Sequence, residues 1–113
     1  LVDRSTGASY VGLLVAVVVG APIVEELFFR GLLLRSLQRR FSPGLAVAIS
    51  SVVFGLAHFS PLPFRAVILV MVSLSVFGAV LAILAVRTGR LGPSIVAHAT
   101  FNLFTILYLT FNG

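Results

Sequence analysis

Hydrophobic residues run through this sequence in long stretches, and polar residues gather in the short breaks between them. The breaks contain Ser42-Pro43-Gly44, Ser60-Pro61-Leu62-Pro63 and Thr88-Gly89-Arg90, which are turn-forming and helix-ending combinations. They divide the chain into helices predicted at about residues 8–40, 43–59, 64–87 and 92–110. These helices lack the polar stripe that a surface helix of a soluble protein carries. The pattern therefore predicts an all-α protein.

The composition indicates what surrounds these helices. Hydrophobic residues make up 59% of the 113 residues, only 10% are charged, and the mean hydropathy is +1.17. A soluble domain usually carries about 25% charged residues. We therefore expect an integral membrane protein, a polytopic bundle of about four transmembrane helices. The length fits one domain, residues 1–113. Because the chain begins with Leu1 rather than Met, we expect it to be the core of a larger membrane domain.

The net charge of +5 would suggest nucleic-acid binding in a soluble chain. Here the arginines lie mostly at the ends of the apolar stretches, which favours anchoring at a lipid bilayer and no nucleic-acid partner. Five arginines lie at or just beyond the ends of the first and third helices (Arg35, Arg39, Arg40, Arg87 and Arg90), against Arg4 and Arg65 on the other side. The loops at about residues 35–44 and 87–92 are therefore predicted to be cytoplasmic, in a prokaryotic plasma membrane. Tyr10 and Tyr108 are predicted to mark opposite ends of the bundle. The absence of Cys excludes disulfides and thiolate ligands.

Two adjacent carboxylates and an arginine interrupt the first apolar stretch, at Glu25, Glu26 and Arg30. Charges in bilayer hydrocarbon are costly and normally face a cavity or a partner. Glu26 and Arg30 are four residues apart, which places them on one helix face in the favourable order for an ion pair. Glu25 points about 100° away. We therefore predict that Glu26 is held by Arg30 and that Glu25 is free to react. Pro22 is expected to kink the same helix just before them.

Two histidines and an asparagine also lie inside the apolar stretches, at His58, His98 and Asn102. From the helix rise, Glu25 lies about 22 Å from Arg40, and His58 lies about 21 Å from Gly44. His98 and Asn102 lie about 10–17 Å into the last helix and share one face. All four can occupy one layer of the membrane. Buried polar groups need partners, so this layer is predicted to be one functional site rather than a structural polar cluster.

Such a set of side chains supports hydrolysis. A carboxylate and an imidazole can deprotonate a water molecule, and His and Asn side chains can donate hydrogen bonds to an oxyanion. Zinc is an alternative cofactor, and Glu25, His58 and His98 would be its ligands if a metal is used. However, the soluble zinc-protease pattern His-Glu-x-x-His is absent. Ser50, Ser51, Ser60 and Ser94 lack the Gly-x-Ser-x-Gly context of a nucleophile, which argues against serine catalysis.

Three short motifs resemble those of the CPBP family, which contains CAAX proteases, bacteriocin-processing enzymes and the type II CAAX prenyl endopeptidases. Residues 25–30 resemble its Glu-Glu-x-x-x-Arg motif, residues 54–58 its Phe-x-x-x-His motif, and residues 98–102 its His-x-x-x-Asn motif. The resemblance implies an intramembrane endopeptidase in which Glu25 and His58 activate water. His98 and Asn102 would stabilise the oxyanion, and Glu26 and Arg30 would support the site.

The resemblance leaves the cofactor and the substrate open. Both a metal-dependent and a glutamate-dependent mechanism have been argued for the family, and its substrates range from prenylated CAAX proteins to bacterial peptides. The expected partner is a protein or peptide at the membrane. A non-catalytic immunity or scaffold protein of the same fold is the alternative function. A proton-relaying transporter is a third, but we find no internal repeat of the kind that such proteins contain.

Overall fold

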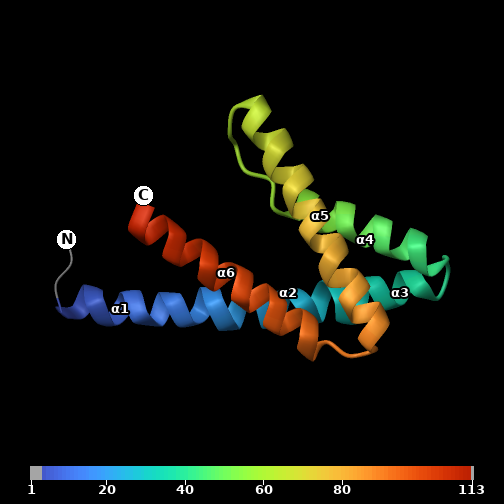
Figure 1. Ribbon diagram of the computed structural model, residues 1–113, viewed down its shortest axis with the longest axis horizontal. Helices are drawn as coiled ribbons and strands as arrows, with labels where there is room; N and C mark the ends of the chain where they lie inside the picture. The colour runs from blue at the N-terminus through green and yellow to red at the C-terminus, as the bar shows by residue number, and fades with distance from the viewer. Residues whose placement is uncertain (1–3, 113) are drawn as a thin grey trace.

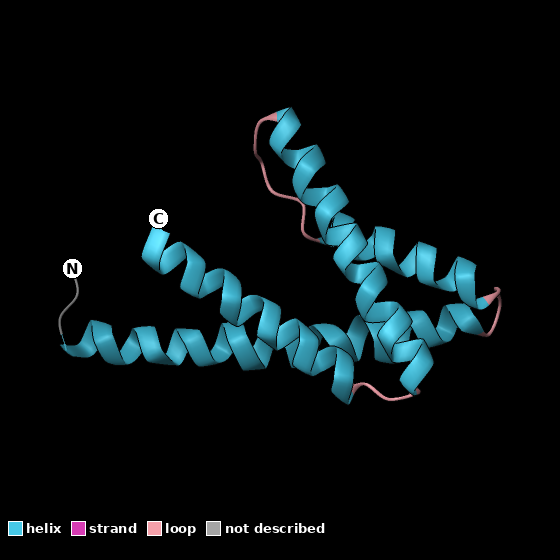
Figure 2. Ribbon diagram, in the orientation of Figure 1, coloured by secondary structure: helices cyan, strands magenta, loops and turns pink. Residues whose placement is uncertain are grey.

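The computed structural model describes residues 4–112 and is built there of helices and short loops, with no strand among these residues (Figures 1 and 2). Residues 1–3 and 113, which the predicted domain includes, lie outside the described residues. The predicted fold class, a helical bundle, is confirmed. The predicted helix boundaries are close to those observed, with differences at the ends of individual helices.

The first predicted helix is one continuous rod that runs along the longest dimension of the molecule (Figure 1). Two wide π-helical turns interrupt its α-helical geometry, and the first of them directly precedes the segment that contains Pro22. The sequence predicts a kink at Pro22, but the helix continues through this residue as one rod, and a π-helical turn precedes it instead. In chain order the rod consists of α1 (Arg4–Val15), a π-helical turn (Ala16–Gly20), α2 (Ala21–Glu26), a second π-helical turn (Leu27–Leu33) and α3 (Leu34–Gln38).

The remaining helices begin and end at recognisable signals. Helix α4 (Pro43–Ala57) is capped by the Ser42 hydroxyl, which accepts a hydrogen bond from the Leu45 N–H at 3.3 Å. It ends at Ala57, two residues earlier than predicted. Helix α5 (Phe64–Thr88) ends at Gly89, whose φ of +68° is readily adopted only by glycine. Helix α6 (Gly92–Asn112) runs two residues further than predicted.

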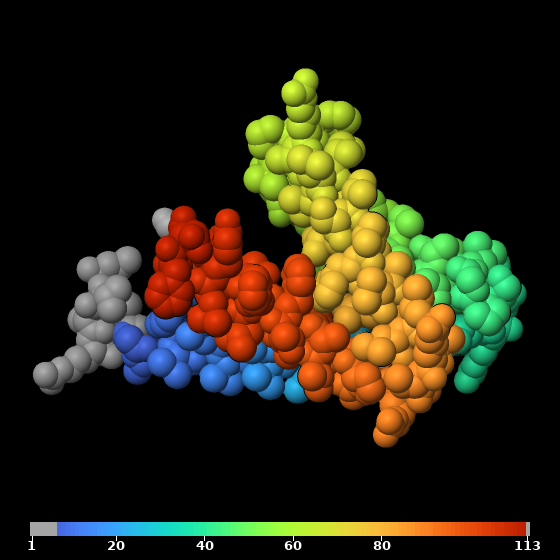
Figure 3. All heavy atoms as spheres, viewed as in Figure 1, coloured from blue at the N-terminus to red at the C-terminus, as the bar shows by residue number. Residues whose placement is uncertain are grey.

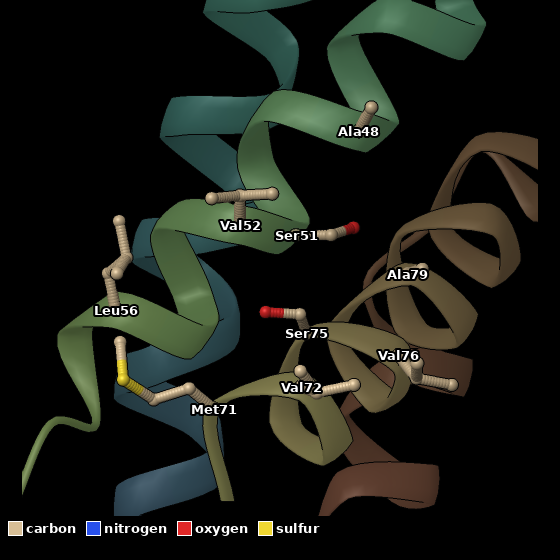
Figure 4. A pocket seen from close by; sticks show the side chains of 9 residues that line it. All are labelled: Ala48, Ser51, Val52, Leu56, Met71, Val72, Ser75, Val76 and Ala79. Carbon is tan, nitrogen blue, oxygen red and sulfur yellow. The ribbon is translucent and has the colours of Figure 1, made fainter. Parts of the chain in front are cut away.

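Helices α4 and α5 form a closely packed pair. A Cβ atom added to Gly55 would collide with the Ser75 side chain and would lie 2.8 Å from the Met71 carbonyl oxygen. Small residues, in which α4 is rich, allow such close approach of helices in membrane proteins. Beside this contact lies a groove of about 470 Å³ into which the Ser51 and Ser75 hydroxyls point (Figure 4). None of the predicted site residues lines this groove.

Helix α6 runs back along the first helix, while the first half of α5 points away from it (Figure 1). The Tyr10 hydroxyl lies 3.3 Å from the Thr110 hydroxyl, so Tyr10 and Tyr108 lie at the same end of the bundle. The prediction of opposite ends was wrong because antiparallel helices return the end of the fourth helix to the start of the first. The divergence of α5 and α6 leaves a notch on the molecular surface (Figure 3), where a groove of about 340 Å³ is lined by Leu69, Val70, Ser73, Leu74, Phe101 and Thr105.

Large hydrophobic side chains cover the outside of the molecule, and charged and hydroxyl groups are buried inside it. Val24, Leu69 and Phe104 are each more than 60% exposed, whereas Glu26 and Arg30 are at most 1% exposed. This distribution is stable only where lipid replaces water around the helices. Among the described residues, Gly7–Gln38, Phe64–Thr88 and Gly92–Asn112 are long and apolar enough to cross a membrane, and Pro43–Ala57 is a shorter apolar helix.

Replacing Gly55 with Ala should lower the melting temperature of the protein. Alanine normally favours a helix over glycine, but here the new methyl group would force α4 and α5 apart at the Met71 carbonyl. Gly44→Ala is the matched control in the same helix, because a Cβ atom there meets nothing within 4 Å. Thermal unfolding in detergent measures the difference. Equal melting temperatures for the two variants would contradict the close contact.

Candidate active site

The site is built around the buried carboxylate of Glu26. Its Oε2 atom accepts two hydrogen bonds, from Arg30 Nη1 at 3.2 Å and from His98 Nδ1 at 2.7 Å. Glu26 is fully buried, and the ion pair predicted from the four-residue spacing is present. Among the described residues, Glu26 Oε1 and Arg30 Nε are buried side-chain atoms without a hydrogen-bond partner. The pair is therefore joined through one oxygen rather than as a two-pronged contact.

Arg30 connects this carboxylate to α5 and α4. Its Nη2 atom donates to the Gly78 carbonyl at 2.8 Å, and its guanidinium lies over the Phe54 ring at 4.5 Å from the ring centroid. A Cβ atom at Gly78 would come within 2.9 Å of the Phe54 ring and 3.3 Å of Arg30 Nη2. The absence of a side chain at residue 78 thus lets the arginine reach the backbone. Three helices are tied together at this point.

Glu25 differs from its neighbour in being partly open. Its side chain is 33% exposed, and its Oε1 atom lies 3.2 Å from His98 Nε2 and 3.8 Å from His58 Nε2. The two histidines come from α6 and from the end of α4, so residues 25, 58 and 98 meet as their depths in the helices predicted. Glu26 is thus buried and Glu25 partly exposed, while the predicted freedom of Glu25 to react stays a prediction.

The tautomer of His58 follows from its contacts. Its Nδ1 atom lies 2.7 Å from the Phe54 carbonyl oxygen, which can only accept, so this nitrogen carries a hydrogen. In the neutral ring Nε2 then carries a lone pair, and this lone pair faces Glu25. The Phe54 ring packs against His58 at a centroid distance of 4.5 Å and fixes the plane of the imidazole. His58 is thus oriented as a proton acceptor.

His98 lies between the two glutamates, with one ring nitrogen facing each. Two carboxylates, the Arg30 guanidinium and a protonated His98 sum to zero formal charge. A balanced cluster of this kind reduces the cost of placing charges in a medium of low polarity, provided that hydrogen bonds satisfy them. His98 is only 3% exposed, and the edges of Phe54 and Phe77 enclose it.

The side-chain amide of Asn102 contacts neither glutamate nor histidine. Its Nδ2 atom donates to the Val17 carbonyl in the first π-helical turn at 3.1 Å. The hydroxyls of Ser50, Ser51 and Ser94 each donate to a carbonyl of their own helix or its N-terminal flank. The hydrogen bonds of these three hydroxyl groups are therefore made within or next to their own helices.

Several contacts in the site come from groups that the sequence analysis did not select. The Gly78, Phe54 and Val17 carbonyls each accept a hydrogen bond from a site residue. Backbone carbonyls carry no sequence signature. The Phe54 ring has a weak one, because it precedes His58 by four residues and so lies on the same helix face.

The donor set does not form a metal centre in this structure. Among residues 4–112 no group of three His, Cys, Asp or Glu side chains is arranged to hold a metal ion. His98 is hydrogen-bonded at both ring nitrogens to carboxylates, which leaves no free nitrogen for coordination. The observed contacts therefore give no support to a metalloprotease assignment.

Comparison with known proteins identifies the group to which this site belongs. The sequence matches the family model of the type II CAAX prenyl endopeptidase Rce1-like proteins over residues 7–104, which is most of the chain. The chain belongs to this family. The match to the Rce1-like family confirms the resemblance carried by the three motifs, and together with the three long apolar helices it identifies an integral membrane protein.

One relative of this Rce1-like chain is the uncharacterized protein YyaK of Bacillus subtilis strain 168, which is 32% identical over 106 residues. The aligned region covers 89% of this chain and 36% of YyaK, so the chain spans about a third of that relative's length. No solved structure matches the chain.

Replacing Arg30 with Ala should strongly destabilise the protein. The change leaves the Glu26 carboxylate buried with one donor fewer and also removes the contacts with Gly78 and Phe54. Removing one partner of a buried ion pair typically costs about 3–5 kcal/mol. The yield of folded protein and its melting temperature measure the effect. Arg35→Ala, in the same helix but exposed, is the control. Wild-type stability of Arg30→Ala would show that the pair contributes nothing.

Proposed function

We propose that this chain is the catalytic core of a membrane-embedded endopeptidase in which Glu25 activates water without a metal. The observation that supports it best is the position of Glu25, a partly exposed carboxylate between two imidazoles in a chain of the Rce1-like family. Glu26 and Arg30 support the site, because Glu26 fixes His98 and Arg30 fixes the surrounding helices. The substrate is a protein or peptide at the membrane.

The nucleophilic water is held between Glu25 and His58. The two facing atoms, Glu25 Oε1 and His58 Nε2, are both hydrogen-bond acceptors, and their separation of 3.8 Å is too long for a direct hydrogen bond. A water molecule donates one hydrogen to each of them. Glu25 takes a proton as the water oxygen attacks the carbonyl carbon of the substrate, and it passes this proton to the leaving amine when the carbon–nitrogen bond breaks.

His98 is the donor to the oxyanion in this proposal. Its Nε2–H bonds to Glu25 in the resting site, and this contact weakens once Glu25 has accepted the proton. The hydrogen is then free to donate to the negatively charged oxygen of the tetrahedral intermediate. Glu26 holds the other ring nitrogen throughout. Asn102 has a second amide hydrogen beyond the one bonded to Val17, and the resemblance assigns it to the same oxyanion.

The proposed setting is a prokaryotic plasma membrane, with the loops at about residues 35–44 and 87–92 on the cytoplasmic side. The arginine distribution supports this orientation. A non-catalytic membrane protein of the same fold is the competing function. No contact in the site favours it, because an inactive scaffold has no need of a partly exposed carboxylate between two imidazoles.

Replacing Glu25 with Gln should abolish peptide cleavage and leave the fold intact. Glutamine keeps the shape and one hydrogen-bond acceptor but cannot take a proton from water. General-base catalysis contributes about 10²–10⁴-fold, so activity should fall by at least roughly a hundredfold. We would express wild-type and Glu25→Gln full-length protein in the natural host and compare peptide termini in the membrane fraction by mass spectrometry.

Termini present only with the wild type would identify both the activity and its substrate. A matching melting temperature for the two proteins is the required control. Identical termini from two stably folded proteins would favour the non-catalytic alternative. Full activity in Glu25→Gln, with cleavage still dependent on the protein, would instead show that another group activates the water.

The same assay tests the role of a metal. We expect cleavage to persist after treatment with a strong chelator, because both ring nitrogens of His98 are occupied by carboxylates. Elemental analysis of the purified protein should find less than one zinc per chain. Loss of activity on chelation, with recovery when zinc is added back, would contradict a glutamate-dependent mechanism and favour a metalloprotease.

A further inference from the structure

One backbone carbonyl near the site cannot be satisfied by its own helix. In the π-helical turn Ala16–Gly20, the Ala21 N–H donates to the Ala16 carbonyl, five residues back. This N–H is the one that Val17 would use in regular α-helical geometry. In the wider π-helical geometry Val17 would instead use the N–H of residue 22. Residue 22 is proline and has no N–H.

Asn102 supplies the missing hydrogen. Its Nδ2 atom donates to the Val17 carbonyl at 3.1 Å, across 85 residues of sequence. An unpaired carbonyl in hydrocarbon costs several kcal/mol, so a side chain from a neighbouring helix is the usual remedy when proline interrupts a membrane helix. The contact joins α6 to the first helix one turn beyond His98, which lies four residues before Asn102 in α6.

We infer that Asn102 is a positioning residue whose side-chain amide replaces the N–H that Pro22 lacks, and that this contact fixes α6 so that His98 faces both glutamates. The proposal assigns a joint role to Pro22, Val17 and Asn102 that neither the motif resemblance nor the ion-pair network contains. It rests on the proposed function only for its activity readout.

Pro22 offers a sharp test of this role. Pro22→Ala restores an N–H at residue 22, so Val17 gains a backbone donor whether the turn stays π-helical or becomes α-helical. Asn102→Leu removes the amide while keeping an apolar side chain of similar size. If the Asn102 amide replaces the missing N–H, removing this amide should lower the melting temperature in the wild-type background. The decrease should be much smaller in the Pro22→Ala background. The two variants and their combination form a double-mutant cycle.

We would measure this cycle on the full-length protein in detergent. Asn102→Leu alone should lower the melting temperature by about 4 °C, the shift expected between a domain of 60–100 residues and one of 150–250 residues when a hydrogen bond of about 1 kcal/mol is lost. In the Pro22→Ala background the loss should be less than half as large. Asn112→Leu is the control, because Asn112 Nδ2 donates only within α6, to the Tyr108 carbonyl. Its effect should be the same in both backgrounds.

The positioning of His98 needs a readout that stability alone does not move. Nitrogen-15 NMR of labelled histidine reports the hydrogen bonds at both ring nitrogens, and the His98 signals are assigned by their loss in His98→Gln. Asn102→Leu should shift these signals, and adding Pro22→Ala should return them toward the wild type. Cleavage activity should follow the same order.

Several results would overturn the inference. Equal losses of melting temperature in the two backgrounds, or unchanged His98 signals in Asn102→Leu, would show that the contact with Val17 positions nothing. A loss of activity that is the same in both backgrounds, with no change in melting temperature or His98 signals, would mean that Asn102 acts on the oxyanion alone. Because the melting temperatures and NMR signals do not depend on cleavage, the cycle remains decisive if the proposed function fails.

A companion variant covers the case in which Pro22→Ala does not accumulate. Asn102→Gln keeps an amide donor on a longer side chain. Its melting temperature should therefore fall by less than half as much as that of Asn102→Leu. Equal losses for the two variants would contradict the inference without any change at residue 22.

Discussion

The buried carboxylate of Glu26 is the constraint on which the rest of this bundle depends. A fully buried negative charge in a membrane protein persists only if donors surround it. Arg30, four residues further along the same helix, and His98, from α6, both donate to the same oxygen atom. Arg30 then needs its own partners, which it finds in the Gly78 carbonyl and the Phe54 ring. The requirement to satisfy one charge thus positions α4, α5 and α6 around the first helix.

The surroundings of Glu25, the proposed reactive residue, follow from this arrangement. Once Glu26 holds Nδ1 of His98, the opposite ring nitrogen points at Glu25. Glu25 is adjacent in sequence but rotated by about 100° on the helix. It therefore faces His58, and its side chain is partly exposed. Neighbouring identical residues therefore take different roles because the helix sends them to different environments. The buried member provides order, and the partly exposed member is available for chemistry.

Some of this site could be predicted from the sequence because helix geometry is regular. The four-residue spacing gave the Glu26–Arg30 pair, and the helix rise gave the common depth of Glu25, His58 and His98. The partner of Asn102 could not be predicted in this way. It depends on the π-helical turn beside Pro22, which changes the hydrogen-bond register locally. The role of the Gly78 carbonyl could not be predicted either. Every backbone carbonyl can accept a hydrogen bond, and only the packing of α5 decides which carbonyl lies within reach of Arg30.

The early end of α4 places non-helical backbone beside the candidate site. Its 15 residues extend about 22 Å, less than a hydrocarbon core of about 30 Å, and it ends just before His58. The following residues up to Pro63 are not helical, and irregular backbone at membrane depth is tolerated where it borders protein or water. The loop between α4 and α5 therefore begins beside the partly exposed Glu25 and His58. In the function that we propose, water is needed at that place, and the early end of α4 leaves non-helical backbone there instead of a further helical turn.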